Sequence, residues 1–363
     1  MLCRENFHVA ALMAAAGAII ATSLAMPASA AETIKLVAID GYPAKAMWVD
    51  QFSKFFIPLV NEKLAETGNY EIEWQEAYGG AIVKPKGVLE GIKLGLGDIG
   101  VVTTVFHASK LPSQALAYVT PFISSDATVV AKAMDEVAME FDSPSAEFAA
   151  ENQVYLSTGV VLDSYQIFTT QPVNSLSDLE GKKIAGAGYN LRYLEAIPGA
   201  AGVRAGLTDM ATMLQTGTVD GAMIWAEAAK TFGYGEFAPY MLKSNLGSVA
   251  SKSVTINKDV WDGLPQEVKD VLQSSATEYR DHIANEAMKR AEASVEAFKA
   301  AGGTVVELSA EERQNWADSA PNIAAEWAAG LDESGSQGTE MLAAYLAKLD
   351  AAGQTALRDW TAN

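Results

Sequence analysis

The feature that most limits the possible folds is one long helical pattern late in the chain. Pro265 suits the first position of a helix, and apolar residues keep helical spacing from Val268 to Phe298, before Gly302 and Gly303. About 36 residues at 1.5 Å per residue give a helix on the order of 50 Å long. Because such a helix is longer than one small domain, we expect it to run along two domains.

A second segment, from Ser175 to Ile224, alternates short strands with short helices and glycine turns. Its expected elements are a capped turn at 177–181, a strand at 183–185, a helix from about Asn190, and a helix that Thr208 caps and Gly217 closes. A strand follows at the VDG motif. This alternation implies a parallel sheet, in which ligands lie beyond the carboxyl ends of the strands.

The order and spacing of four motifs resemble a known family. SLSDLEGKKI at 175–184 is followed by LQTGTVDG at 214–221 and NKDVWDGLPQEVKDVL at 257–272, and EAYGGAIVKPKGVLEGIKLGLGDIGVV stands earlier at 76–102. Together they resemble the solute-binding proteins of TRAP transporters, periplasmic receptors of the DctP type. The resemblance implies two α/β domains with a ligand cleft between them, a long helix spanning both, and delivery of a small organic solute to a TRAP-type membrane permease.

The same resemblance suggests domain boundaries. Domain I is expected to comprise residues 31–157 and 247–280, and domain II residues 158–246 and 281–335, with a C-terminal helical extension at 336–363. The chain is expected to cross first near residues 155–160 and to return through a strand at 248–256.

Two positions depart from the family pattern. Where these proteins usually carry an arginine directly after the strand, to clamp a ligand carboxylate, this chain has Ala185, and Ile224 stands where many carry asparagine. Candidate replacement cations are Arg192, Arg204 and Lys84. Arg192 is preferred because it follows the glycine turn near the expected cleft mouth, and the alternative is a surface pair with Glu195. With such a cation the ligand would be an organic acid or another anion.

The opposite hypothesis uses aromatic residues near the ends of expected strands. An aromatic cage with nearby carboxylates would hold a cationic, zwitterionic or neutral solute, and its candidates are Tyr42, Trp48, Tyr165, Tyr189, Trp225, Asp40 and Asp163. Ordinary core packing explains most of these aromatic residues equally well.

Enzymatic function has no positive support in the sequence. The chain has three histidines and one cysteine, and it lacks a nucleophile elbow, a Walker A motif and a zinc-protease motif. We therefore expect no catalytic residue, no cofactor and no metal, and we rank a periplasmic enzyme below a receptor. A receptor for another transporter class, or a sensor, is a further alternative.

Charge and the amino-terminus bear on location and partners. A net charge of −19 argues against nucleic acid as a partner. Residues 1–30 combine Arg4, an apolar run from Val9 to Leu24 and the small residues Ala28-Ser29-Ala30, so we expect an export signal cleaved near Ala30. The expected location is the periplasm, and the expected state is a monomer.

Overall fold

The computed structural model describes residues 31–362, which fold into two α/β domains built on separate mixed sheets. The export signal expected at 1–30 lies outside the described residues. The first sheet has the strand order β2 (Tyr70–Ala77), β1 (Glu32–Ile39), β3 (Ile99–Thr103), β10 (Val249–Asn257) and β4 (Gln153–Leu162). The second has the order β11 (Thr304–Glu307), β9 (Tyr240–Lys243), β5 (Tyr165–Thr169), β8 (Gly221–Trp225), β6 (Lys183–Gly186) and β7 (Ala201–Arg204).

Both sheets combine parallel and antiparallel pairs. In the first, β1 runs parallel to β2 and β3, while β10 runs antiparallel to β3 and β4. In the second, β6 is parallel to β7 and β8, as expected for this segment, whereas β5 is antiparallel to β8 and β9. The carboxyl ends of β1, β3 and β8 therefore open toward the region between the sheets, where a ligand is expected in such folds.

Twelve of the thirteen α-helices of the described chain are short or of medium length. They are α1 (Met47–Gln51), α2 (Ile57–Thr67), α3 (Val88–Lys93), α4 (Leu116–Val119), α5 (Ala127–Glu140), α6 (Ser143–Ala150), α7 (Leu207–Gln215), α8 (Ala226–Thr231), α9 (Lys258–Gly263), α11 (Ala310–Ser319), α12 (Ile323–Glu333) and α13 (Gly338–Ala351). The remaining helix is α10 (Gln266–Ala300). A π-helical segment at Phe52–Phe56 joins α1 and α2 into one helical stretch, which packs against α10.

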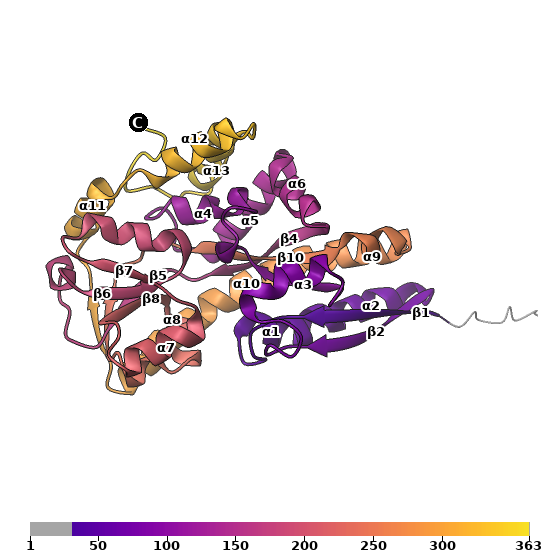
Figure 1. The fold of residues 1–363 in the computed structure, drawn as a ribbon, viewed down its shortest axis with the longest axis horizontal. Coiled ribbons are helices and arrows are strands. Elements are labelled where there is room, and N and C mark those ends of the chain that lie inside the picture. Colours follow the sequence, from indigo (N-terminus) through magenta and orange to yellow (C-terminus); the bar gives the residue numbers. More distant parts are fainter. Residues whose placement is uncertain (1–30, 363) are drawn as a thin grey trace, which may run out of the picture.

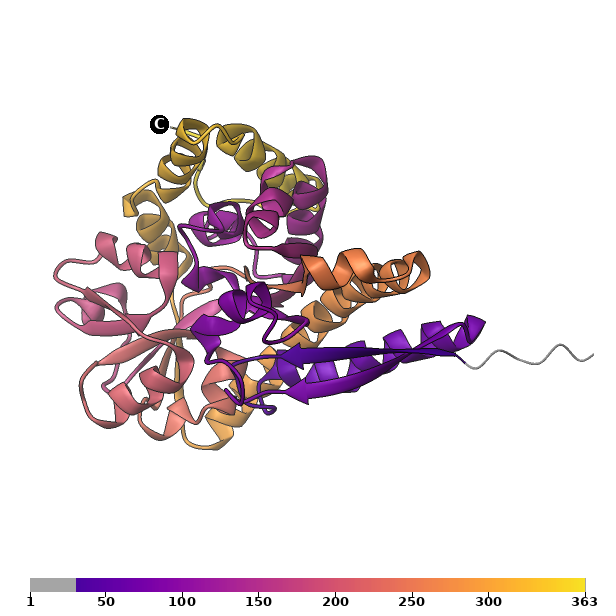
Figure 2. The ribbon, with the colours of Figure 1, turned by 45° about the vertical axis from the view of Figure 1, so that its right-hand side comes forward.

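The long helix α10 confirms the expectation drawn from the 265–302 pattern. Its 35 residues begin directly after Pro265, and the helix contacts β4 and α5 of the first domain as well as α8 and β11 of the second. Figures 1 and 2 show it passing from one domain to the other. It is therefore a rigid element shared by both sheets.

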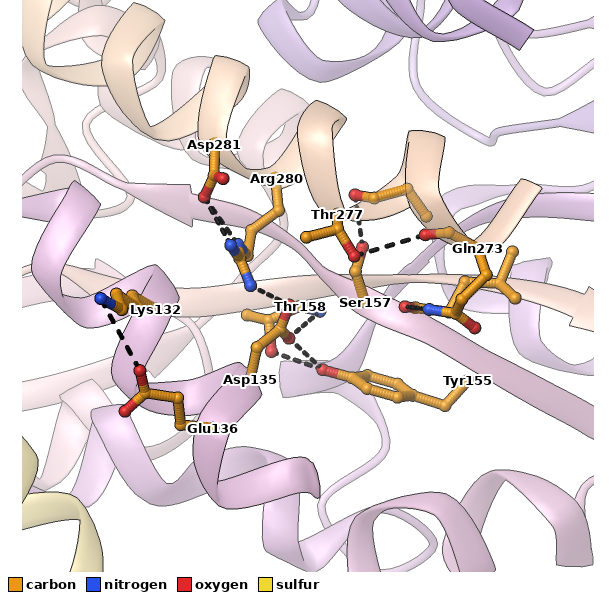
Figure 3. A network of polar contacts seen from close by, with 12 residues as sticks. Lys132, Asp135, Glu136, Tyr155, Ser157, Thr158, Gln273, Thr277, Arg280 and Asp281 are labelled. Atoms are coloured by element: carbon orange, nitrogen blue, oxygen red, sulfur yellow. Dashed lines mark hydrogen bonds and ion pairs between the residues drawn. The ribbon is translucent and has the colours of Figure 1, made fainter. Parts of the chain in front are cut away.

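Polar contacts anchor α10 to the first domain. Arg280 of α10 forms a buried ion pair of 2.6 Å with Asp135 of α5, and it also contacts Asp281. Asp135 additionally accepts hydrogen bonds from the Tyr155 hydroxyl and the Thr158 amide, each at 2.6 Å (Figure 3). Three elements thus share one carboxylate, which fixes the position of the helix against β4.

Several local expectations need correction. The helix expected from Asn190 is a 3-10 helix at 188–196, because the Asn190 side chain accepts from the Ala187 amide and favours a turn over an α-helix. Gly206 rather than Thr208 precedes α7, and no side chain caps it. Gly217 does follow α7 in the left-handed conformation, with φ 67°, as expected.

The chain passes between the sheets slightly later than expected. Residues 155–160 lie inside β4, which continues to Leu162, and β5 of the other sheet begins at Tyr165. The final helices return toward the first domain, since α12 contacts α4 and α13 contacts α5. Both views show these helices beside α4, α5 and α6 (Figures 1 and 2). The residue boundaries of the two domains stay a prediction.

Candidate functional site

A small cavity lies between the carboxyl-end edges of the two sheets. The first domain contributes the side chains of Tyr42, Thr103, Val105, Phe106, Tyr118, Ser251 and Lys252. The second contributes Tyr165, Ala187, Ala205, Leu207, Met210, Met223 and Trp225, together with Gly206. Its volume is about 30 Å³, room for about two water molecules. The two walls therefore lie close together in this structure, and the cavity is too small for an organic solute.

Lys252 is the most unusual residue of this cavity. It lies on β10 opposite Thr103, is 3% exposed, and alone carries a charge among the described lining residues. Its Nζ donates to the Ser251 hydroxyl at 3.0 Å and forms no ion pair within the described part of the chain. An ammonium group has three donors, and only one of them has a hydrogen-bond partner among the described residues.

Three aromatic rings surround the Lys252 ammonium. Its Nζ lies 3.9 Å from the centroid of the Trp48 ring, 5.8 Å from that of Trp225 and 6.0 Å from that of Tyr42. Attraction to the ring faces partly replaces the water that burial removes. Burial nevertheless lowers the pKa of Lys252 to about 7, and the charges of Asp40 and Glu227 oppose this fall.

Asp40 and Glu227 lie behind the indole rings. Asp40 follows β1 and accepts from the Tyr42 amide at 2.7 Å and from the Trp48 indole at 3.1 Å. Glu227 of α8 accepts from the Trp225 indole at 3.2 Å and from the Thr231 hydroxyl at 2.7 Å. Both carboxyl groups are buried and hold the rings that face Lys252. Burial raises the pKa of Asp40 to about 7, although its hydrogen bonds and Lys252 act the other way.

The backbone places Asp40 and Trp48 with little freedom. A Cβ on Gly41 would lie 2.1 Å from the Pro85 nitrogen, so only glycine lets the turn after β1 approach the 84–85 loop. The Trp48 carbonyl accepts a hydrogen bond of 2.6 Å from the buried Tyr279 hydroxyl of α10. The shared helix therefore sets the position of one wall of the cavity.

Asp163 lies in the connection between the two sheets. It is 4% exposed, and its Oδ1 has no hydrogen-bond partner among the described residues. Burial, followed by the nearby Glu227 charge, raises the pKa of Asp163 well above its ordinary value. Burial at this point therefore favours the neutral form of the carboxyl group.

The structure brings together five of the ten expected site residues, places Asp163 beside this group, and places the other four apart. Tyr42, Trp48, Trp225 and Asp40 surround Lys252, and Tyr165 packs against Trp225 with ring centroids 5.6 Å apart. The expected cage is thus present as an arrangement of rings, but the ammonium that it encloses belongs to the protein. Asp163 is adjacent through Glu227, and Tyr189 is half-buried outside the lining.

The expected cations lie elsewhere. Arg192 forms ion pairs with Glu195 at 2.6 Å and with Glu326 of α12 at 2.7 Å, which corresponds to the surface alternative. Arg204 ends β7 as an exposed residue, and Lys84 is exposed in the loop before α3. None of the three lines the cavity. The two departures from the family pattern are apolar and fully buried, with Ala185 opposite Ala222 and Ile224 opposite Gln166.

Sequence reasoning missed Lys252 although a signal was present. The segment SVASKSVTI was assigned to a strand returning to the first domain, and Lys252 is its one charged residue. All nine residues of the observed strand are buried. Lysine is almost never fully buried without a partner, so a lysine inside such a strand marks a candidate site.

Two further observations limit the chemistry. Within residues 31–362 no group of three or more histidine, cysteine or acidic side chains is arranged to hold a metal ion. In the same range, no helix has the length and apolar character needed to cross a membrane.

Comparison with known proteins identifies relatives of the whole fold. A family model for bacterial extracellular solute-binding proteins, family 7, matches residues 42–330. The ectoine-binding periplasmic protein TeaA of Halomonas elongata is 26% identical over 259 residues, which are 68% of this chain and 72% of TeaA.

Solved structures resemble the chain at lower sequence identity. A TRAP periplasmic solute-binding protein from Desulfovibrio salexigens has a TM-score of 0.74 at 22% identity, covering 87% of this chain and 95% of that one. A TRAP solute-binding protein from Rhodoferax ferrireducens, in complex with copurified benzoate, has a TM-score of 0.78 at 18% identity, covering 88% and 98%. The two-domain fold expected from the sequence is thereby confirmed.

Proposed function

We propose that this chain, which belongs to family 7 of the bacterial extracellular solute-binding proteins, is a periplasmic receptor that binds a small organic acid between its domains and delivers it to a TRAP-type permease. Family membership makes the chain a solute receptor and not an enzyme. The nature of the solute and its delivery are the proposed parts.

The observation that carries the organic acid is the buried Lys252 ammonium. A buried cation without a directly bonded anion is costly, and a ligand carboxylate is the group that would relieve this cost with charge-assisted hydrogen bonds. A cationic ligand would instead have to displace the ammonium from the rings or approach it against like charge. The Lys252 ammonium beside Trp48 and Trp225 therefore supports an anionic solute over the cationic alternative.

Closure follows from the same arrangement. Lys252 and Trp48 belong to the first domain, whereas Trp225 and Glu227 belong to the second. A solute that touches both walls binds the closed form better than the open form, and this difference in affinity favours closure. Because family members of this kind serve TRAP transporters, the closed receptor is the form that we expect a permease to recognise.

A thermal-shift screen of residues 31–363 tests the proposed ligand class. Carboxylic acids should raise the melting temperature by mass action, and amines and betaines should not. Arg192→Ala serves as a control that should keep the shift, because Arg192 is already paired with Glu195 and Glu326. Shifts with amines or betaines alone would contradict the proposal and favour the cationic or zwitterionic alternative.

Delivery needs a separate test. Uptake of the acid into membrane vesicles that carry the TRAP-type permease encoded beside this receptor should depend on adding the receptor. Equal uptake without the receptor would contradict this part of the proposal. Amino-terminal sequencing of the protein from a periplasmic fraction should begin near Ala31 if the expected signal is cleaved.

A further inference from the structure

We infer that Lys252 makes this receptor selective for organic acids with a single negative charge and an apolar body, and that it excludes dicarboxylates. The inference rests on the proposed function and refines it. It assigns the choice of ligand charge to Lys252, one residue of β10.

The first step is the charge available in the cavity. Within the described lining, Lys252 supplies one positive charge and no second cation stands beside it. Asp40 and Glu227 are the nearest ionisable groups, and both are carboxyl groups held by indole hydrogen bonds. One ligand carboxylate would therefore find a partner, and a second would find only desolvation and like charge.

The second step is the cost of that second charge. A buried carboxylate without a partner loses several kcal/mol of hydration, and neither Asp40 nor Glu227 can offset the loss. We therefore expect a dicarboxylate to bind about a hundred-fold more weakly than a monocarboxylate of the same size.

The third step is the nature of the walls. Away from Lys252 the cavity is closed by aromatic and aliphatic side chains, among them Phe106, Leu207, Met210 and Met223. Five lining side chains carry hydroxyl groups, and the hydroxyls of Tyr118 and Tyr165 lie 3.4 Å apart. An aliphatic or aromatic ligand body would bury favourably against the apolar side chains, and the lining hydroxyls offer partners for only a few polar groups of the ligand.

The amino-terminus of α7 supports this placement. Gly206 precedes the helix and lines the cavity, and no side chain caps the first turn. Free backbone amides at such a position favour a nearby anion. The same turn carries Asp209, so α7 offers backbone donors at this edge of the cavity without adding a positive charge.

The test compares matched pairs of acids on residues 31–363 by titration calorimetry. Benzoate is paired with terephthalate, and butyrate with succinate, so that each pair differs mainly by one carboxylate. Wild-type protein should bind at least one monocarboxylate about a hundred-fold more tightly than its partner. Lys252→Met should abolish this binding, and Arg192→Met should leave it unchanged.

The outcomes separate the inference from the proposed function. Equal or tighter binding of the dicarboxylates would overturn the inference and leave an organic-acid receptor standing. Unchanged monocarboxylate binding by Lys252→Met would also overturn it, provided that the variant melts at least as high as wild type. If no acid of either charge binds, the proposed function fails, and the inference fails with it.

Discussion

At the residue scale, the protonation of Lys252 determines how we expect the receptor to bind an acid. Lys252 is buried against Trp48, and burial lowers its pKa to about 7. At neutral pH its charge is therefore sensitive to small changes in its surroundings. A ligand carboxylate should hold the proton on Lys252, since an opposite charge nearby favours the charged form.

Acid binding should consequently weaken above neutral pH. Below pH 7 the ammonium is present and the free receptor is ready for an anion, whereas above pH 7 binding must first take up a proton. We expect affinity for a monocarboxylate to fall by up to about tenfold per pH unit above pH 7. Asp40, whose pKa burial raises to about 7, loses its proton in the same range and acts in the same direction.

Calorimetric titrations between pH 6 and pH 9 measure this dependence. Lys252→Arg is the matched control, because a guanidinium stays charged throughout this range and should give weaker but nearly pH-independent binding. Constant wild-type affinity over three pH units would rule out the assigned role of the ammonium.

Replacing the buried ammonium should stabilise the free protein. Lys252→Met removes a buried charge and keeps most of the side-chain volume, so we expect a gain of about 1–4 kcal/mol near pH 7. In wild type the unfolded lysine holds its proton up to about pH 10 and the folded lysine only to about pH 7. Wild-type stability should therefore rise between these values, and the advantage of the variant should shrink.

Chemical denaturation of wild type and of Lys252→Met at pH 7 and pH 9.5 measures the difference in their free energies of unfolding and how it changes with pH. A destabilised variant at pH 7, or a difference that does not change with pH, would mean that the native ammonium is compensated by contacts other than those described.

At the scale of elements, the long helix α10 holds the cavity wall through buried contacts. Arg280 pairs with Asp135, and Tyr279 bonds the Trp48 carbonyl. Removing one partner of a buried pair leaves an uncompensated charge. We expect Arg280→Met to lower the free energy of unfolding by about 3 kcal/mol.

Lys299→Met is the control on the same helix, because Lys299 pairs with Glu296 at the surface and such pairs contribute little. Urea denaturation of both variants provides the comparison. Similar small effects from the two changes would contradict the anchoring role of Arg280.

Sequence patterns predict long elements better than short ones. Periodicity placed α10 within one residue of its start, because a long amphipathic pattern after Pro265 leaves few alternatives. Periodicity could not place β7, which has only four residues, or the 3-10 helix, where the Asn190 side chain competes locally for the backbone. Hydrophobic periodicity predicts an element well where buried positions recur regularly. It fails where the contact of one side chain determines the local backbone.

The candidate site shows the same limit. Strand ends and aromatic residues led to Tyr42, Trp48 and Trp225, which do meet in space. The partner at their centre comes from β10, more than two hundred residues beyond Tyr42 in the chain, and only the folded topology places it there. Arg192 was preferred from its distance to a strand end, and Glu326 of a distant helix pairs with it instead.

At the scale of the whole molecule, the proposed function requires the two domains to separate and close. Lys45, between β1 and α1, donates to the Thr231 carbonyl at the end of α8 at 3.1 Å and lies 5.2 Å from the centroid of the Phe232 ring. This contact joins the two domains away from the cavity. Because the lysine is exposed, we expect Lys45→Ala to speed ligand release only about two- to five-fold.

Stopped-flow dissociation of a bound acid measures this rate. Melting of the ligand-free protein should stay unchanged, and Lys54→Ala, which removes an exposed lysine of the first domain, should leave release unaffected. An unchanged release rate in Lys45→Ala would show that this contact does not hold the closed form.

The role of Lys252 is tested most directly by a crystal structure of residues 31–363 with a bound monocarboxylate. The decisive measurement is the distance from the carboxylate to Lys252 Nζ. We expect a carboxylate oxygen at about 2.7–2.9 Å from Lys252 Nζ, the range of a charge-assisted hydrogen bond, with the body of the acid between the aromatic walls. A carboxylate bound to Arg192, Arg204 or Lys84, with Lys252 out of contact, would contradict the account.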